Sequence, residues 1–281
     1  MEINRANIFE IINKASLQPD KDYGQNFLVE PEISKRIVDS LKVESDENVL
    51  EVGPGLGSLT HFLSMLDNKI TVVDIDKRMT DFLKIVYQNT TIEIIENDIR
   101  KVDVSEYEKI VGNLPYNITT EAIQYFLLNS PKAKKMVFMI QSETFNHFSD
   151  VSGKEYGPTS VLIHLLGDVE KLFSVKAGSF YPAPKCSSVV FAINNIRESN
   201  NRNEAIGAFK VAKLLFANRR KTILNNLNNY LKKKELANEL CEVLNINPLS
   251  RPEQLSPEIY LRIFDYLSSK WLRLLKIYFK I

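Results

Sequence analysis

The chain has 281 residues, 44% of them hydrophobic, and a formal net charge of +1. This length suits one medium domain beside a smaller one, and the apolar content is ordinary for a globular protein. Two distant cysteines exclude a disulfide framework and give no metal-binding spacing, and no apolar run is long enough for a membrane span. The first twenty residues carry acids and lack the apolar core of a signal peptide, so we expect a cytoplasmic protein.

The first half of the chain alternates between predicted strands and helices. In chain order we expect a helix at 6–15, a helix at 31–43, a strand at 47–52, a helix at 58–67, a strand at 69–75, a helix at 77–89, strands at 91–98 and 108–116, a helix at 118–130 and a strand at 134–143. This alternation predicts an α/β fold with a parallel sheet, whose ligands lie at the carboxyl ends of its strands.

The second half of the chain has a different pattern of predicted elements. We expect a helix at 155–167, strands at 168–175 and 187–194 around a proline-rich turn, and only helices from residue 203 onwards. The polar run near residue 200 predicts a boundary between a domain at 1–200 and a helical domain at 201–281. From residue 209 to the end there are fourteen Lys or Arg against six Asp or Glu, which indicates either a basic binding module or a solvated helical surface.

A glycine-rich turn joins the first of these strands to a helix in the stretch "VLEVGPGLGSLT". Gly53, Gly55 and Gly57 allow positive φ angles and close approach of a ligand, although a tight strand–helix connection has the same requirement. Asp74 ends the next strand and Asp98 the one after it, where carboxylates bind ribose hydroxyls and an adenine amine. Either acid alone is more typical of a helix cap or a solvated turn. Together they predict an adenosine-containing cofactor, and the G-x-G-x-G spacing favours S-adenosylmethionine over NAD.

The stretch "IVGNLPYNITT" places an amide, a proline and an aromatic ring at the end of the following strand. A planar amine can donate one hydrogen bond to the Asn113 side-chain carbonyl and the other to the Leu114 backbone carbonyl, which Pro115 holds in place. Tyr116 can stack on the ring that carries the amine. Such a site orients the amine towards a methyl group without a general base. A strand-ending turn with a core tyrosine is the alternative, but the upstream glycines and acids favour a catalytic site.

At these motifs the chain resembles the ribosomal RNA adenine N6-dimethyltransferases, and within them the bacterial small-subunit branch, the KsgA family. The similarity covers nearly all of residues 22–265 in the order "YGQNFLVEPEI", "VLEVGPGLGSLT", "VVDIDKRM", "NDIRKVD", "VGNLPYNITT", "EYGPTSVLIHLLGDVEKLFSVKAGSFYPAPKCSS" and "LLFANRRKTILNNL". It implies a Rossmann-like methyltransferase sheet with a smaller all-helical C-terminal domain.

The resemblance also implies roles for individual residues. The cofactor would be bound by Gln25, Asn26, Leu28, Gly53, Gly55, Asp74, Asp98 and Asn113, with Asp74 where this branch more often has Glu. The target adenine would be held by Asn113, Leu114, Pro115 and Tyr116, with Phe180 stacked on its other face. Two departures are "CSS" at 186–188 in place of the usual "VDS", and a basic tail at 268–281 that we expect to pack as a helix.

The implied substrate is a pair of adjacent adenines in a small-subunit rRNA hairpin loop of an immature ribosomal particle, each receiving two methyl groups. The adenines must be unpaired or flipped out, and Arg219, Arg220 and Lys221 are the candidate phosphate contacts. We expect a monomer that binds this RNA, no metal and no membrane. The alternatives are a macrolide-resistance methylase of large-subunit rRNA, a non-catalytic assembly or transcription factor, and a methyltransferase of protein or small-molecule amines.

Overall fold

The computed structural model describes the backbone of residues 1–20, 24–115, 118–196 and 202–278, and the side chains of these ranges up to residue 269. Two compact units are present: Met1–Phe145 with Glu170–Ile196 forms the first, and Asn146–Val169 with Arg197–Ile281 forms the second. This division differs from the predicted single boundary near residue 200, because residues 146–169 pack with the C-terminal helices. The last division between the two units follows Ile196, and the predicted boundary near residue 200 lies in 197–201, outside the described residues.

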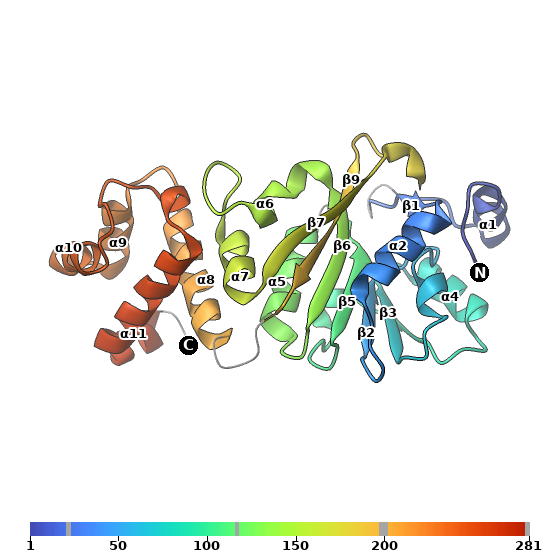
Figure 1. Ribbon diagram of the computed structural model, residues 1–281, viewed down its shortest axis with the longest axis horizontal. Coiled ribbons are helices and arrows are strands. Elements are labelled where there is room, and N and C mark those ends of the chain that lie inside the picture. Colours follow the sequence, from blue (N-terminus) through green and yellow to red (C-terminus); the bar gives the residue numbers. More distant parts are fainter. Residues whose placement is uncertain (21–23, 116–117, 197–201, 279–281) are drawn as a thin grey trace. The chain divides into compact units, whose positions relative to one another are not determined.

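The first unit is built on a seven-stranded sheet in the order β4-β3-β2-β5-β6-β9-β7 (Figure 1). Its strands are β2 (Val49–Val52), β3 (Ile70–Asp74), β4 (Glu93–Glu96), β5 (Lys109–Asn113), β6 (Lys135–Gln141), β7 (Asp168–Val175) and β9 (Ser188–Asn194). β2 to β6 are parallel to one another, as predicted, whereas β9 is antiparallel to β6. The parallel strands therefore bring their carboxyl ends to one edge of the sheet.

One face of the sheet is covered by α2 (Pro31–Leu41), α3 (Thr60–Leu63) and α4 (Lys77–Val86). Proline at the first turn starts α2, because the missing N–H is not needed there, and its buried Ile37 and Leu41 join the core of Val111 and Val137. Figure 1 shows α2 lying across the sheet. α3 is shorter than the predicted helix at 58–67, since turns replace its ends.

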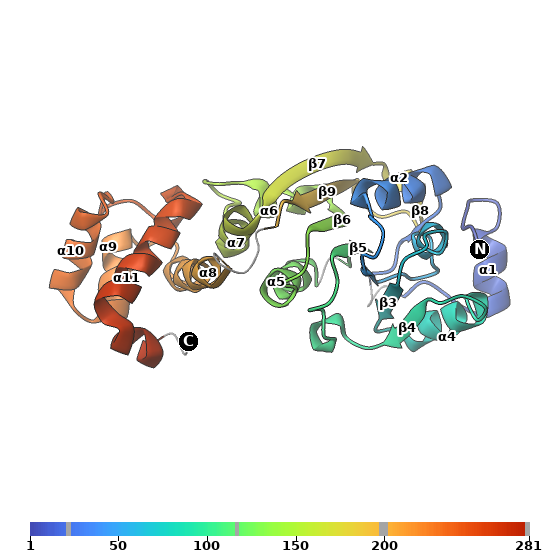
Figure 2. The same cartoon turned by 60° about the horizontal axis from the view of Figure 1, so that its bottom comes forward.

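The opposite face is covered by α5 (Thr119–Asn129), which lies on the other side of the sheet from α2 in Figure 2. Phe126 of α5 stacks on Phe138 of β6 with ring centroids 5.7 Å apart. Side chains alternate along a strand, so Phe138 and its neighbour Val137 pack on opposite faces. Burial on both faces explains why the central strands β2, β5 and β6 are mostly apolar.

Five short elements in this unit were not predicted as such: two strands and three 3-10 turns. The strands β1 (Phe27–Leu28) and β8 (Phe180–Tyr181) form a separate antiparallel pair, in which Leu28 lies opposite Phe180. The helix α1 (Ile8–Ala15), which was predicted, packs on this pair through Phe9 and Tyr181, with ring centroids 4.6 Å apart. The remaining elements are 3-10 turns: η1 (Ile99–Lys101), η2 (Ser142–Thr144) and η3 (Ala177–Ser179).

The second unit consists of helices, as the sequence predicted for its C-terminal part. They are α6 (Asn146–Ser149), α7 (Pro158–Leu166), α8 (Arg202–Phe216), α9 (Ile223–Leu231), α10 (Lys234–Val243), η4 (Pro252–Gln254) and α11 (Pro257–Tyr278). Gly207 allows α8 and α11 to cross closely, because a Cβ there would lie 2.2 Å from the Phe264 ring. The predicted tail helix is present up to Tyr278 as the end of α11.

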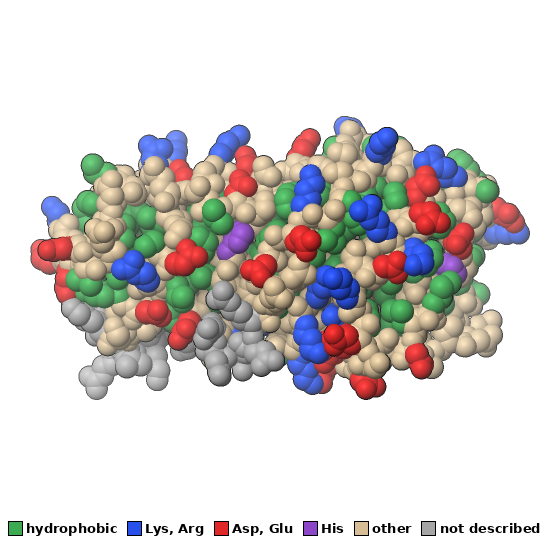
Figure 3. All heavy atoms as spheres, in the orientation of Figure 1, with side chains coloured by type: hydrophobic (Ala, Val, Ile, Leu, Met, Phe, Trp, Pro, Cys, Tyr) green, Lys and Arg blue, Asp and Glu red, His purple; other side chains and the backbone are tan. Residues whose placement is uncertain are grey.

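Acidic and basic side chains are interspersed over the face of the molecule shown in Figure 3. Among the described residues, no helix combines the length and apolar character needed to cross a membrane.

Candidate active site

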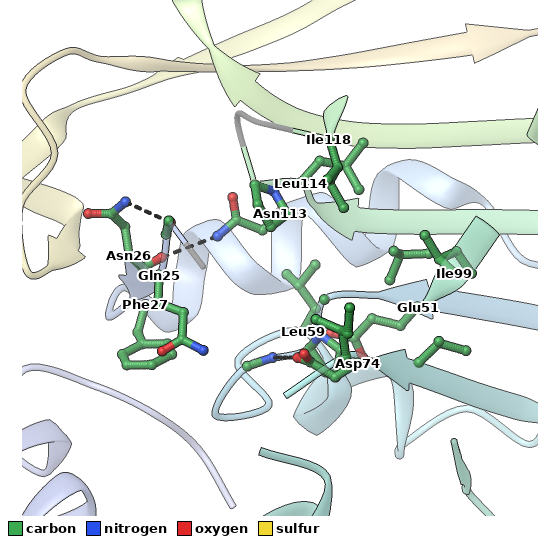
Figure 4. A pocket seen from close by; sticks show the side chains of 18 of the residues that line it. Gln25, Asn26, Phe27, Glu51, Leu59, Asp74, Ile99, Asn113, Leu114 and Ile118 are labelled. Carbon is green, nitrogen blue, oxygen red and sulfur yellow. Dashed lines mark hydrogen bonds between the residues drawn. The ribbon is translucent and has the colours of Figure 1, made fainter. Parts of the chain in front are cut away.

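A cavity of about 300 Å³ opens at the carboxyl ends of β2, β3 and β5 (Figure 4). The predicted site residues that line it are Gln25, Asn26, Leu28, Gly53, Gly55, Asp74, Asp98, Asn113, Leu114, Pro115 and Phe180. Tyr116 lies outside the described residues. Segments far apart in the sequence therefore meet in one cavity, as expected for ligands at the strand ends of an α/β sheet.

The glycine loop after β2 depends on backbone conformations that other residues rarely adopt. Gly53 and Gly55 have φ angles of 66° and 54°. A Cβ at Gly55 would lie 3.2 Å from the Phe27 ring, so a larger residue would displace the β1 segment. The loop thus leaves room for a ligand only because its side chains are absent.

Asp74 supports this loop from the end of β3. Its Oδ2 accepts the backbone N–H of Gly55 at 3.2 Å, and its Oδ1 accepts that of Asp76 at 2.9 Å. Burial raises the pKa of Asp74 to about 6 in spite of these two bonds. The carboxylate that we predicted to hold a ribose is therefore also a brace for the cofactor loop.

Glu51 is a lining residue that the sequence analysis did not identify. It is 1% exposed and its Oε2 accepts the Thr60 hydroxyl at 2.6 Å. Figure 4 shows it beside Asp74, on the neighbouring strand. Burial raises the pKa of Glu51 to about 8. The available signal was a charged residue inside the apolar strand "VLEV", since a buried acid needs a partner or a function.

Asp98 follows β4 and has two functions in the structure. Its Oδ1 accepts a hydrogen bond from the backbone N–H of Arg100 at 3.0 Å, so Asp98 caps the short helix η1. A helix cap was the alternative role that the sequence analysis gave for this acid. Asp98 also lines the cavity, together with Arg100, which the sequence analysis did not identify. The Arg100 guanidinium holds the pKa of the Asp98 carboxyl below its usual range, so this side chain is ionised at neutral pH.

Asn113 ends β5 and faces residue 26 across the cavity (Figure 4). Its Nδ2 donates to the backbone carbonyl of Asn26 at 3.3 Å, which turns the other end of the carboxamide, the oxygen, away from that partner. The following residue is fixed as well, because the Leu114 N–H donates to the Met139 carbonyl at 3.1 Å. A Cβ at Gly112 would lie 2.6 Å from the Val52 carbonyl oxygen, so β2 and β5 approach closely beneath the cavity.

The segment at residues 24–28 lines the cavity and is linked to the start of α4 and to β8. Gln25 Nε2 donates to Asp76 Oδ2 at 2.8 Å, at the start of α4. The β1–β8 pair brings Phe180, which is 5% exposed, into the lining opposite Leu28. Phe180 is thus near the other predicted site residues although it is remote from them in sequence.

The three candidate RNA-binding cations of the second unit differ in their surroundings. Arg219 donates from Nη2 to the Gly153 carbonyl at 2.7 Å and lies 3.5 Å from a carboxylate oxygen of Glu253. Arg220 and Lys221 are exposed. Arg219 therefore anchors the turn between α8 and α9, and the next two residues present their charges to solvent.

The polar lining of the cavity fits S-adenosylmethionine better than NAD. Asp74 and Asp98 supply carboxylates, which accept hydrogen bonds from amines and hydroxyls and attract cations. S-adenosylmethionine presents an ammonium group, a sulfonium centre, ribose hydroxyls and an adenine amine. The pyrophosphate of NAD would instead be repelled by these acids. Within the part of the chain that is described, no cluster of three His, Cys, Asp or Glu forms a metal site.

Comparisons with known proteins agree with this geometry. Residues 16–269 match the model of the family described as ribosomal RNA adenine dimethylase. The chain is 35% identical over 263 residues to a Malacoplasma penetrans protein named ribosomal RNA small subunit methyltransferase A, covering 91% of this chain and 94% of the relative. A protein of the same name from Neisseria meningitidis is 34% identical over 256 residues, covering 89% and 96%.

Solved structures show the same fold. A dimethyladenosine transferase from Plasmodium falciparum is 25% identical with a TM-score of 0.74, covering 87% of this chain and 98% of that one. The 23S rRNA methyltransferase ErmE is 23% identical with a TM-score of 0.65, covering 86% and 100%, and this likeness concerns the fold alone. The cavity, the fold and the match over most of the sequence agree, and the chain is therefore a member of the ribosomal RNA adenine dimethylase family.

Proposed function

We propose that the protein transfers methyl groups from S-adenosylmethionine to the exocyclic amines of two adjacent adenines in a small-subunit rRNA hairpin loop, giving dimethyladenosines during ribosome biogenesis. The observation that carries this proposal is Asn113 at the end of β5, in the same cavity as the carboxylates of Asp74 and Asp98. Family membership and the small-subunit names of the relatives support the reaction and the choice of RNA.

The cofactor would be held by residues from four segments. Asp74 and Asp98 would accept hydrogen bonds from the ribose hydroxyls and the adenine amine, and Gly53 and Gly55 would let the backbone approach the methionine portion. Gln25, Asn26 and Leu28 would cover it from the N-terminal side. S-adenosylmethionine supplies an electrophilic methyl group on its sulfonium sulfur.

The acceptor amine would be oriented by Asn113 and Leu114. The lone pair of an adenine amine is delocalised into the ring, so the nitrogen is a poor nucleophile. The Asn113 carboxamide oxygen and the Leu114 carbonyl oxygen would each accept a hydrogen bond from one N–H of the amine. These two bonds localise the lone pair and aim it at the methyl carbon. The hydrogen bond from Asn113 Nδ2 to the Asn26 carbonyl supports this role, because it leaves the carboxamide oxygen to accept a hydrogen bond from the adenine amine.

Pro115 restricts the backbone beside these acceptors, and Phe180 would stack on one face of the target base, as Tyr116 would on the other. The nitrogen becomes acidic once it carries the new methyl group and loses its proton without a dedicated base. A second methylation of the same adenine requires that the site also accept a monomethylated amine.

The RNA would be bound by both units of a monomeric protein, in an immature ribosomal particle in the cytoplasm. The first unit would supply cofactor binding, catalysis and the pocket for the target adenine, and the helices of the second unit would contact the surrounding RNA. A base inside a duplex cannot enter the cavity, so the adenines must be unpaired or flipped out. The exposed cations Arg220 and Lys221 would contact phosphates, while Arg219 would hold their turn in place.

The test is incubation of the full chain with immature small ribosomal subunits and labelled S-adenosylmethionine, with protein-free large-subunit rRNA as the competing substrate. We expect label in dimethyladenosine of the small-subunit RNA only. Label confined to large-subunit RNA would make the protein a large-subunit methylase, and the absence of label from adenine in either RNA would reject the proposal.

A further inference from the structure

Arg100 borders the cavity at the point where Asp98 enters it. Both residues line the cavity, but they differ in exposure: the side chain of Asp98 is 14% exposed and that of Arg100 is 41% exposed. The less exposed Asp98 carboxylate is therefore paired with a more exposed guanidinium. Its guanidinium is planar and presents several N–H donors in a fixed arrangement.

The Arg100 guanidinium donates two roughly parallel hydrogen bonds to the Asp98 carboxylate. Arg100 Nε donates to Asp98 Oδ1 at 2.9 Å, and Nη2 donates to Oδ2 at 2.7 Å. The backbone N–H of Arg100 adds a third bond to Oδ1 at 3.0 Å. Two parallel bonds and a backbone bond leave the carboxylate little freedom to rotate, so its plane is fixed relative to the cavity.

The other end of the guanidinium is anchored on α5. Arg100 Nη1 donates to Oε2 of Glu121, in the first turn of that helix. The two anions hold the cation between them, and this arrangement raises the pKa of Arg100 further. Because the guanidinium is bonded to both Asp98 and Glu121, it can hold the Asp98 carboxylate in one orientation.

We propose that Arg100 is a positioning residue for nucleobase recognition, which holds Asp98 so that its carboxylate accepts from the exocyclic amine of the cofactor's adenine and rejects a 6-oxo purine. This inference rests on the proposed function, since it takes Asp98 as the residue that contacts the adenine. An ionised carboxylate only accepts hydrogen bonds, so an amine satisfies it, whereas the exocyclic carbonyl oxygen of a 6-oxo purine at the same position is another acceptor. Selectivity of this kind depends on the carboxylate pointing at the amine.

The experiment measures binding to the full chain by titration calorimetry, without RNA and without turnover. The two ligands are S-adenosylhomocysteine and its deaminated analogue, in which an oxygen replaces the exocyclic amine. The quantity compared is the preference, the ratio of the two dissociation constants. The variants are Arg100→Met and Arg100→Lys, and the matched control is Lys101→Met, which removes an exposed cation from the next position.

We expect Arg100→Met to reduce the preference for the amine by about tenfold, the scale of one charge-assisted hydrogen bond. Arg100→Lys should reduce it similarly, because an ammonium group cannot form two parallel bonds to a carboxylate. Lys101→Met should stay within about twofold of the wild-type preference, as expected for an exposed charge. A preference unchanged in Arg100→Met, or fully restored in Arg100→Lys, would overturn the proposed role of the guanidinium.

The variant Asp98→Asn separates this inference from the proposed function. It keeps the shape of the side chain but adds a donor, so the preference should fall or reverse if Asp98 contacts the base. If Asp98→Asn keeps the full preference, the assignment of Asp98 fails. If Asp98→Asn loses it and Arg100→Met does not, only the role of Arg100 is rejected.

Discussion

The cavity of the first unit and the Arg219–Lys221 turn of the second present polar groups in contrasting ways. In the cavity, the acid of Glu51 is buried and that of Asp74 is partly buried, and each accepts hydrogen bonds at defined distances. At the turn, Arg220 and Lys221 extend into solvent. Buried, bonded groups select a ligand by its shape and its donors, whereas exposed charges act over several ångströms and are screened by salt. Substitutions should therefore have large, specific effects in the cavity and small, salt-dependent effects at the turn.

The largest effect is expected from Asn113→Ala. Methyl transfer should fall by at least about 1000-fold, because the variant loses an acceptor that orients the amine and stabilises the charge developing on it. Binding of S-adenosylmethionine should change by less than about fivefold, since its main polar contacts are assigned to other residues. Single-turnover methylation and calorimetry measure the two quantities.

Asn129→Ala is a suitable control for this variant. Asn129 is an exposed residue at the end of α5 whose amide donates to the Tyr125 carbonyl. It should retain wild-type methylation. A strong loss of cofactor affinity in Asn113→Ala, with methylation preserved once the cofactor is saturating, would contradict the role of Asn113 in holding the acceptor.

Gly112→Ala tests the close packing beneath the cavity. The new Cβ would lie 2.6 Å from the Val52 carbonyl oxygen, so adjacent strands must separate. We expect a loss of about 3 kcal/mol in the free energy of unfolding, in the range of overpacked buried sites. Chemical denaturation gives this number. Gly178→Ala, where no atom lies within 4 Å of the new Cβ, should be close to neutral, and equal stability of the two variants would disprove the steric account.

Glu51→Gln tests the buried acid through pH. The folded-state pKa is raised from the ordinary value of 4.5 to about 8, so this group favours folding fully below the unfolded value and loses that contribution as pH rises towards 8. The linkage is at most about 1.4 kcal/mol per pH unit. Because Glu51 borders an open cavity, we expect about 2 kcal/mol in total between pH 5 and 8, with the glutamine variant gaining stability relative to wild type.

Denaturation curves across this pH range measure the effect of Glu51→Gln. Glu32→Gln, which makes the same substitution at an exposed position, is measured alongside it as the matched variant. A flat difference for Glu51→Gln would show that Glu51 ionises freely in the folded protein.

The smallest effect is expected at the turn of the second unit. Replacing Arg220 and Lys221 by Gln should weaken RNA binding and reduce the slope of log affinity against log salt by about one for each phosphate that is no longer neutralised. Stability should stay within about 0.5 kcal/mol, because both side chains are exposed. Arg219→Gln should instead lower stability, since it removes the bond to the Gly153 carbonyl. An unchanged salt slope in the double variant would leave these cations as ordinary surface charges.

The sequence was most informative where glycine, acidic or amide residues follow one another at the carboxyl ends of successive predicted strands. Gly53, Gly55, Asp74, Asp98 and Asn113 all line the same cavity. Parallel topology made this possible, because it brings every carboxyl end to one edge.

The residues that were missed depend on contacts across the fold. Glu51 is a charged residue in an otherwise apolar strand, but its place in the site depends on the packing of Thr60 and Asp74 around it. Arg100 had no pattern to identify it, because its significance lies in bonds to Asp98 and Glu121. The strands β1 and β8 are too short to show any periodicity. Likewise, the grouping of residues 146–169 with the C-terminal helices is a matter of packing, which local sequence does not specify.

The pairing of β1 with β8 also determines when the catalytic unit can be completed during synthesis. Leu28 is made early, but its partner Phe180 is made only after most of the sheet has been translated. Contacts between such distant positions form late, because a long loop must close first. On the ribosome, the nascent chain is therefore expected to hold an unfinished binding pocket until residue 181 has left the exit tunnel, and the protein should acquire affinity for its cofactor only then.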